Sequence, residues 1–246
     1  MLLKKLHKLI FILCCLGMIF SFSKRNYFPE RWNVTAEAAN DPLQNPTIQL
    51  PFKIKKGENE FFIEPLYDYK ITGIVVSYRQ HDLENGLHKK WGEKGDNLNI
   101  SDICVVWGSN IKSELLNHID FYNGDYTCFF ETKSQSVFDS FKQDQLSNNH
   151  LLSADQRIIK KINQIKRGDQ IQIEGLLANY GDKNGIIRKS SVTRKDTDNG
   201  ACETLYVTDF KIINHTQYPF SLWKASWMGA LLTIVTWFIA VGVGIL

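Results

Sequence analysis

Residues Tyr67–Tyr78 read YDYKITGIVVSY, and apolar and polar side chains alternate along most of this stretch. A period of two in a run rich in aromatic and β-branched residues predicts a strand with one face on a hydrophobic core. Ile100–Trp107 (ISDICVVW) and Tyr126–Glu131 (YTCFFE) have the same character and predict two further strands. The fold is therefore expected to be mainly β.

The pattern changes in Ala154–Arg167, where Ile158, Ile159, Ile162 and Ile165 recur at helical spacing. Ser153 and Asp155 are suitable helix caps, so one amphipathic helix is expected here. After the turn at Gly168-Asp169, the alternation returns and predicts strands in three stretches: 171–177, 186–191 and 203–213. Three strands, a helix and two or three strands is the order of a small OB-like Greek-key barrel, and an open α+β sheet is the alternative.

The N-terminal residues 1–23 resemble an export signal. Lys4, Lys5 and Lys8 precede an uncharged apolar run, Leu9–Phe22, which is the order of a secretory signal. Small residues at Ser21 and Ser23 offer a cleavage site, so a cleaved signal peptide and an uncleaved signal anchor both remain open.

The C-terminal residues 223–246 are expected to form a transmembrane helix. From Ala225 to Leu246 no residue is charged, and this run is long enough to cross a hydrocarbon core of about 30 Å. Residues 24–60 contain four prolines and are expected to be an extended linker, which leaves 61–215 as the folded domain. With the basic N-terminus inside, the domain is expected on the outer, periplasmic side of a bacterial inner membrane.

Three segments together resemble a family of uncharacterised bacterial envelope proteins: SDICVVWG (101–108), SNNHLLSA (147–154) and SSVTRKDTDNGACE (190–203). The family has an Asp-Leu…Trp-Gly strand, an Asn-His-Leu-Ile-Pro segment and a Ser-Ser-x-x-Arg-x-Asp-x-Gly-x-Gly-Ala-Cys-Glu segment. This chain departs from the pattern at Ser153 and Asp198, where Pro and Gly are usual. The resemblance implies a shared fold and a shared special site, but it names no activity.

The residues that match this pattern supply the candidates for catalysis: His150, Cys202 and Glu203. Cys202 would be the nucleophile and His150 the base, with Glu203 or Asp196 as the group that orients it. The alternative for His150 is local hydrogen bonding at the start of the helix. Cys104, Cys128 and Cys202 are an odd set, and the alternative for Cys202 is a disulfide with Cys128 or Cys104.

The candidates for binding are Arg194, Asp196, Asn149, Asp102 and Trp107. Arg194 is suited to clamp an anion, or it pairs with Asp196 and Glu203 to organise a loop. The stretch Asp196–Gly200 has its glycine one place early for an EF-hand and lacks the distal glutamate, so no metal site is predicted.

The charge of the chain and the motifs that it lacks disfavour several classes of function. A net charge of +3, with basic clusters that contain no aromatic residues, does not favour nucleic-acid binding. No phosphate-binding glycine loop, paired-cysteine zinc motif or Gly-x-Ser-x-Gly elbow occurs, so an enzyme is disfavoured and no cofactor is predicted. We expect an envelope accessory or adaptor protein that binds a protein partner; the alternatives are an enzyme using Cys202 and His150, or a small-molecule or glycan-binding module centred on Arg194.

Overall fold

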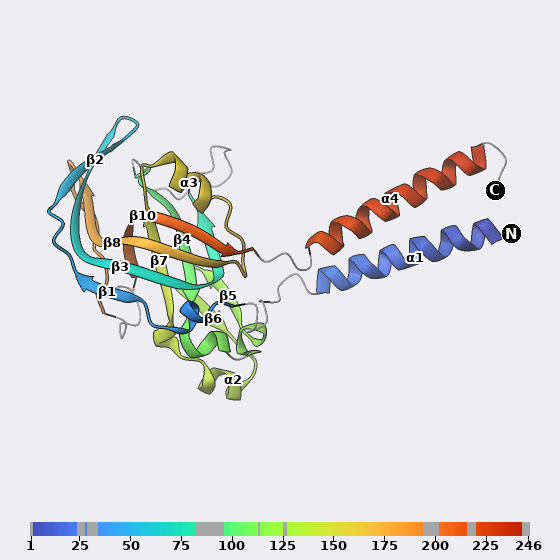
Figure 1. The fold of residues 1–246 in the computed structure, drawn as a ribbon, viewed down its shortest axis with the longest axis horizontal. Coiled ribbons are helices and arrows are strands. Elements are labelled where there is room, and N and C mark those ends of the chain that lie inside the picture. Colours follow the sequence, from blue (N-terminus) through green and yellow to red (C-terminus); the bar gives the residue numbers. More distant parts are fainter. Residues whose placement is uncertain are drawn as a thin grey trace. The chain divides into compact units, whose positions relative to one another are not determined.

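The computed structural model of the chain describes residues 2–23, 28, 34–81, 96–112, 114–124, 127–193, 202–215 and 220–242 (Figure 1). These residues fall into two compact units. One contains the terminal helices α1 (Leu2–Ser23) and α4 (Phe220–Gly242), and the other, Phe28–Thr216, contains the strands.

The strands are β1 (Leu43–Pro46), β2 (Phe52–Lys56), β3 (Asn59–Gln80), β4 (Asn99–Val106), β5 (Asp120–Asn123), β6 (Cys128–Glu131), β7 (Leu146–Leu152), β8 (Gln170–Asp182), β9 (Gly185–Arg188) and β10 (Cys202–Asn214). The helices of the same unit are α2 (Gln135–Ser140) and α3 (Gln156–Ile162), with the 3-10 helices η2 (Ala36–Ala39), η3 (Gly108–Lys112), η4 (Glu114–His118) and η5 (Gln143–Gln145). The predicted mainly β class is confirmed.

Five strands of the large mixed sheet are hydrogen-bonded in a closed order. β3 pairs antiparallel with β4 and with β8, β4 pairs antiparallel with β7, and β8 pairs antiparallel with β10. The step that completes the order joins β7 to β10, which run parallel. In Figure 1 the long strands β3 and β8 curve side by side. β1 and β2 extend the sheet from β3, and β9 extends it from β8.

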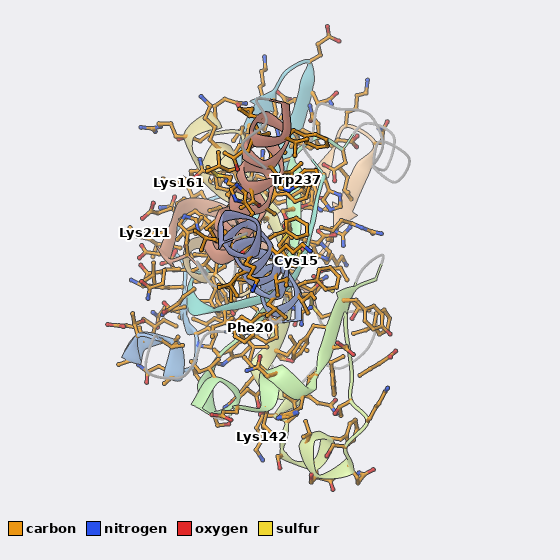
Figure 2. All side chains as sticks on the ribbon, turned by 90° about the vertical axis from the view of Figure 1, so that its right-hand side faces the viewer. Cys15, Phe20, Lys142, Lys161, Lys211 and Trp237 are labelled. Carbon is orange, nitrogen blue, oxygen red and sulfur yellow. A yellow bond between two sulfur atoms is a disulfide. The ribbon has the colours of Figure 1, made fainter. Side chains whose placement is uncertain are left out.

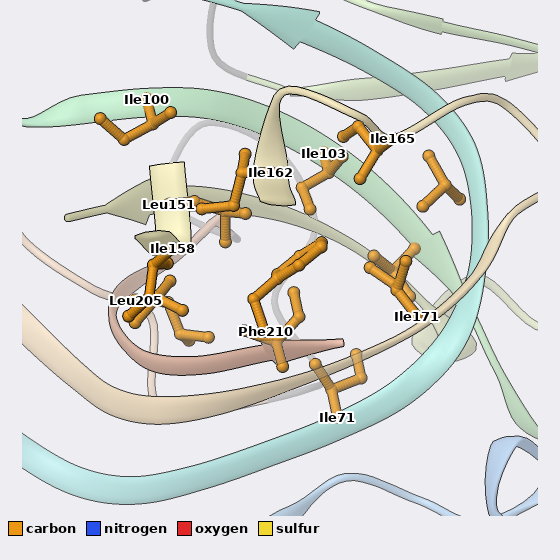
Figure 3. Close-up of a cluster of buried hydrophobic side chains, with 14 of the residues drawn as sticks. Ile71, Ile100, Ile103, Leu151, Ile158, Ile162, Ile165, Ile171, Leu205 and Phe210 are labelled. Atoms are coloured by element: carbon orange, nitrogen blue, oxygen red, sulfur yellow. The ribbon is translucent and has the colours of Figure 1, made fainter. Parts of the chain in front are cut away.

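The main core lies between these strands and α3 (Figure 3). Alternating residues such as Ile71, Ile173 and Phe210 point into it, as the period of two predicts. α3 adds Ile158 and Ile162 from one face, so the expected amphipathic helix is present, although it is shorter than the predicted range. Its N-cap is Asp155, whose side chain accepts a hydrogen bond from the backbone N–H of Arg157 at 2.8 Å.

The predicted third strand was placed in the wrong sheet. In this stretch the structure has β6, which among the described strands pairs with β5 alone, in a separate two-stranded sheet. The third strand of the main sheet is β7, in a polar segment for which the sequence pattern predicts no strand. A disulfide between Cys104 and Cys128 joins β4 to β6, and the aromatic residues of the small sheet cover a second core on that side of β4.

The predicted linker 24–60 is also partly wrong. It contains β1, β2 and the first residues of β3, and the folded unit begins at Phe28. The prolines that suggested a linker are compatible with this arrangement because Pro46 ends an edge strand and Pro51 lies between two strands.

Basic residues lie on the outer surface of α3 and β10. Lys161 and Lys211, both labelled in Figure 2, lie about half exposed and share one carboxylate. Their Nζ atoms are 3.6 Å and 2.9 Å from the carboxylate oxygens of Asp209. These are surface ion pairs, which contribute little to stability.

The terminal unit consists of two helices that are long and apolar enough to cross a membrane. The candidate spans are Lys5–Phe22 in α1 and Lys224–Val241 in α4. Most of the described side chains on both helices are exposed, including Leu13, Ile19 and Phe238. Exposed apolar side chains along an entire helix are typical of a lipid-facing surface.

Candidate functional site

Two of the three segments that carry the resemblance lie largely in β4 and β7, and the third ends with the first two residues of β10, which is the neighbour of β7. In the strand register, Asp102 lies opposite His150, and His150 lies opposite Thr204. The adjacent rows are Ile103–Asn149–Glu203 and Cys104–Asn148–Cys202. Five of the predicted site residues are therefore brought into one patch of sheet: Asp102, Asn149, His150, Cys202 and Glu203.

His150 is the centre of this patch and is completely buried. Its Nδ1 atom is 2.5 Å from Oδ1 of Asp102, and its Nε2 atom is 2.7 Å from Nη1 of Arg188. A guanidinium group only donates hydrogen bonds, so Nε2 accepts from Arg188 and the ring proton lies on Nδ1, which donates to Asp102. His150 is thus a neutral imidazole that bridges a carboxylate and a guanidinium.

The carboxylate of Asp102 accepts hydrogen bonds from several neighbouring side chains. Asn99 donates its Nδ2 to Oδ1 at 2.9 Å, and Nε2 of His81 lies 3.0 Å from Oδ2. Burial alone would raise the pKa of Asp102, but the hydrogen bonds from His150 and His81 outweigh it, and the pKa lies well below the usual range. Asp102 is therefore a buried carboxylate that stays ionised.

Arg188 completes the cluster and was not predicted as a site residue. It lies at the end of β9, beside Tyr180 of β8 in the strand register. The hydroxyl of Tyr180 donates to Oδ2 of Asp96 at 2.7 Å, and burial raises the pKa of this hydroxyl, with Asp96 adding to the effect. The only signal for Arg188 in the sequence was its place in a basic cluster, since its partner on β7 lies 38 residues away.

Cys202 is a buried thiol and not part of a disulfide, so the predicted pairing with Cys104 or Cys128 is wrong. The other two cysteines bond to each other because β6 packs over β4. The side-chain amide of Asn148 donates to Sγ of Cys202 at 3.4 Å. Burial raises the pKa of the Cys202 thiol, so it is poorly ionised at neutral pH.

Cys202 and His150 lie on the same face of the sheet, two register positions apart, because Cys202 is opposite Asn148. The lone pair of His150 that would accept a proton from a thiol is already used by Arg188. A nucleophile also needs a lowered pKa or an adjacent base, and the pKa of Cys202 is raised instead. The geometry therefore does not assemble the predicted cysteine–histidine pair.

His150 does not close the start of the helix, which was the other expectation for this residue. It lies inside β7, and the cap of α3 is Asp155. The reason is that its hydrogen-bonding partners come from β4 and β9, at sequence distances of 48 and 38 residues.

Asn149 and Glu203 lie opposite each other and, by strand alternation, on the other face from His150. The side-chain amide of Asn149 donates to Oγ of Ser147 at 2.8 Å and to the carbonyl oxygen of Ile103 at 3.3 Å. Asn149 therefore ties β7 to β4, and Glu203 is buried beside it.

The remaining predicted binding residues lie apart from this patch or outside the described residues. Trp107 is buried in the main core, and its indole N–H donates to Oδ1 of Asp41 at 3.2 Å. Arg194 and Asp196 lie outside the described residues. Among the residues that the structure does describe, no three His, Cys, Asp or Glu side chains are grouped to hold a metal ion.

A second feature is an exposed apolar strip that begins on β1 and continues along the segment that links β1 to β2. We define it by Leu43, Ile48 and Leu50, which are 61%, 94% and 79% exposed. The segment is held by hydrogen bonds at Thr47, whose hydroxyl donates to Asp68 at 2.8 Å and accepts from the N–H of Gln49 at 3.1 Å. The apolar side chains are therefore presented to solvent by an ordered backbone.

Beside the apolar strip lies an open groove with a volume of about 490 Å³. Its apolar lining includes Leu43, Phe52, Leu176 and Tyr206. Its polar lining includes Asp68, Lys70 and Glu174, and the last two form an ion pair at 2.7 Å. Such a groove, with apolar walls and a few charges, is suited to bind an extended chain with mixed side chains.

Comparison of this chain with protein-family models, with curated proteins and with solved structures finds no match in any of the three.

Proposed function

We propose that the chain is a membrane-anchored accessory protein of the bacterial envelope, whose domain binds an extended segment of a partner protein at the apolar strip and its groove. The observation that carries the proposal is the exposure of Ile48 and Leu50, at 94% and 79%, on an ordered segment. Apolar side chains exposed in this way at alternate positions are costly in water and mark interaction surfaces.

The type of partner follows from the backbone around the strip. β1 pairs with β3 only, so among the described strands its other edge carries no strand. An open edge offers backbone hydrogen bonds to an added strand, and the apolar strip offers contacts to alternate side chains of that strand. A tether to the membrane raises the local concentration of such a partner and makes a small contact area sufficient.

We propose further that the domain is an OB-type barrel. Support comes from the closed strand order β3–β4–β7–β10–β8, from the single parallel pair in it, and from α3 between the third and fourth of these strands in the chain. This is the order that the sequence predicts for the OB type, with β7 as the third strand.

The proposed location is the bacterial inner membrane, with the domain on the periplasmic side. The two candidate spans support a membrane attachment. The disulfide between Cys104 and Cys128 supports an oxidising compartment, because such bonds are rare in the cytosol. The resemblance to uncharacterised bacterial envelope proteins points in the same direction.

An enzyme using Cys202 and His150 has less support. The Nε2 lone pair of His150 is used by Arg188, and the raised pKa of Cys202 leaves little thiolate for nucleophilic attack. We assign the cluster of Asp102, His150 and Arg188 to holding β4, β7 and β9 together. A binding module centred on Arg194 remains an alternative, although no described contact favours it.

The test is purification of the tagged full-length protein from membranes in a mild detergent, with mass spectrometry of the retained proteins. We expect a stoichiometric membrane or envelope protein to be retained. We expect this partner to be lost from the Ile48→Asp/Leu50→Asp variant, since charges at these positions remove the apolar contact.

Ile186→Asp is the matched control, because Ile186 is a 53% exposed apolar residue on β9, which β3 and β8 separate from β2 in the sheet. This variant is expected to retain the partner. Equal retention by the double variant would overturn the assignment of the surface, provided that the variants melt at the same temperature. A chain that purifies alone, even after chemical cross-linking in cells, would overturn the accessory function.

A further inference from the structure

We infer that residues 1–23 are not removed as a signal peptide but remain as a transmembrane helix that packs against α4. The chain would then cross the membrane twice as an antiparallel helical hairpin. This inference concerns the terminal unit and does not depend on the proposed binding function.

The first support is a consistent register between α1 and α4. Close contacts join His7 to Thr236, Cys14 to Gly229, and Gly17 to Ser226. Each step along α1 is matched by an equal step backward along α4. The contacts recur at intervals of seven and three residues, which is the spacing of positions on one face of a packed helix. Three independent contacts thus specify one antiparallel alignment.

The second support is the small size of the residues at these contacts. A Cβ atom added to Gly229 would lie 2.8 Å from Sγ of Cys14, and one added to Gly17 would overlap the hydroxyl of Ser226. Ser226 and Ala230 are 7% and 3% exposed on a helix whose other described side chains are mostly exposed. Small residues at a helix interface allow the backbones to approach closely, which is how helices associate within lipid.

The third support is a polar contact between the two helices. Nε2 of His7 lies 3.3 Å from Oγ1 of Thr236. His7 lies between Lys5 and Lys8, near one end of the apolar span, and a polar contact at this end favours the same alignment of the two helices.

The register also places both apolar spans at similar depth. In this alignment Lys5 lies level with Phe238, and Lys224 lies level with Ile19, so the spans Lys5–Phe22 and Lys224–Val241 overlap over most of their length. In this alignment both apolar spans can cross the same hydrocarbon core of about 30 Å while the two helices stay packed against each other. A signal sequence that is later removed requires neither a packing register with α4 nor an apolar span that overlaps with the span of α4.

The expected cleavage site argues in the same direction. Ser21 lies inside α1 and is only 2% exposed, and Ser23 is the last residue of the same helix. Proteolytic cleavage is favoured in exposed, irregular segments. Cleavage here would also uncover the small-residue face of α4.

The hairpin has a consequence for topology. Antiparallel helices bring the basic residues Lys4, Lys5 and Lys8 to the same side of the membrane as the C-terminal end of α4. By the positive-inside rule this side is the cytoplasm, and the domain between the helices lies on the other side.

The experiment uses the full-length chain in cells. In the Cys15→Ser/Gly229→Cys variant, mild oxidation should join Cys14 to the new cysteine, because the Cβ–Sγ separation there is close to that of a disulfide. We expect most molecules to yield the linked peptides in mass spectrometry, and the intact mass of the reduced protein to include residues 1–23. The control is Cys15→Ser/Leu231→Cys, since Leu231 is 52% exposed on the same helix and should give little cross-link.

A second pair keeps the test decisive if Gly229→Cys prevents insertion. His7→Cys/Thr236→Cys, in a background of Cys14→Ser and Cys15→Ser, should cross-link equally well. The inference is overturned if the mature chain lacks residues 1–23, if the Leu231 control cross-links as much as the test pairs, or if neither pair cross-links in an inserted protein.

Discussion

Nδ1 of His150 lies 2.5 Å from Oδ1 of Asp102, although the two residues are 48 positions apart in the chain. On its other side the imidazole accepts a hydrogen bond from Arg188. The ring therefore links a carboxylate on β4 to a guanidinium on β9. A buried network whose members satisfy one another fixes the relative positions of the strands, and breaking it leaves unsatisfied charge.

Replacement of Asp102 by alanine should lower the free energy of unfolding by about 3 kcal/mol or more, because His150 loses its acceptor and Arg188 loses the compensating charge. Urea unfolding of the full-length protein in detergent, followed by fluorescence, measures the change. Asp209→Ala is the control: Asp209 forms surface ion pairs with Lys161 and Lys211 and accepts a hydrogen bond from the backbone N–H of Phe210, and the loss of these exposed contacts should cost about 1 kcal/mol or less. Equal effects of the two variants would contradict the role assigned to the network.

The contribution of Asp102 to the free energy of unfolding should depend on pH. Its pKa in the folded protein is lowered, whereas the unfolded residue has a pKa of about 3.9. The contribution is therefore complete at neutral pH and is lost progressively as the pH falls below about 4. In urea unfolding at a series of pH values, the difference in stability between the wild type and Asp102→Asn should narrow toward low pH. A difference in stability that grows toward low pH would show that the pKa of Asp102 is not lowered in the folded protein.

Native Cys202 should react slowly with a maleimide or with iodoacetamide. The thiol is 8% exposed, and burial raises its pKa, so the reactive thiolate is scarce. Mass spectrometry should find little modification of Cys202 in the folded protein at neutral pH and full modification after denaturation. Rapid labelling of the folded protein would restore the enzyme hypothesis.

Removal of the Cys104–Cys128 disulfide should destabilise the domain without unfolding it. The bond closes a loop with a sequence separation of 24, for which chain entropy predicts a loss of about 3 kcal/mol. The Cys104→Ala/Cys128→Ala variant and the wild type are compared by urea unfolding. Thiol trapping of the wild type in intact cells tests the compartment as well, since a cytosolic domain would keep both thiols reduced.

Much of the fold was predictable because its signals are local. The alternation in 67–78 identified part of β3, the apolar residues in 100–107 identified β4, and the isoleucines of 154–167 identified α3. The two apolar ends were also recognisable, since length and composition alone define a helix able to cross a membrane.

β7 was missed because Asn148, Asn149 and His150 resemble a loop in the sequence. They are stable in a buried strand only because their partners, among them Asp102 and Cys202, are supplied by other strands. The candidate site was predicted in part: Asp102 and His150 were among the candidates, but Arg188 was not, and neither was the hydrogen bonding of the cluster. The hydrogen bond from Arg188 to His150 depends on the pairing of β9 with β8, and no local pattern in the sequence predicts that pairing.

The central claim is that the domain works through the apolar strip. The most direct measurement is photo-cross-linking in cells, with a photoreactive amino acid at position 48 and, as the control, at position 186. The account predicts one specific adduct to an envelope or membrane protein from position 48 and none from position 186. Adducts to lipid alone, or no adduct from position 48 in a protein that reaches the membrane, would contradict it.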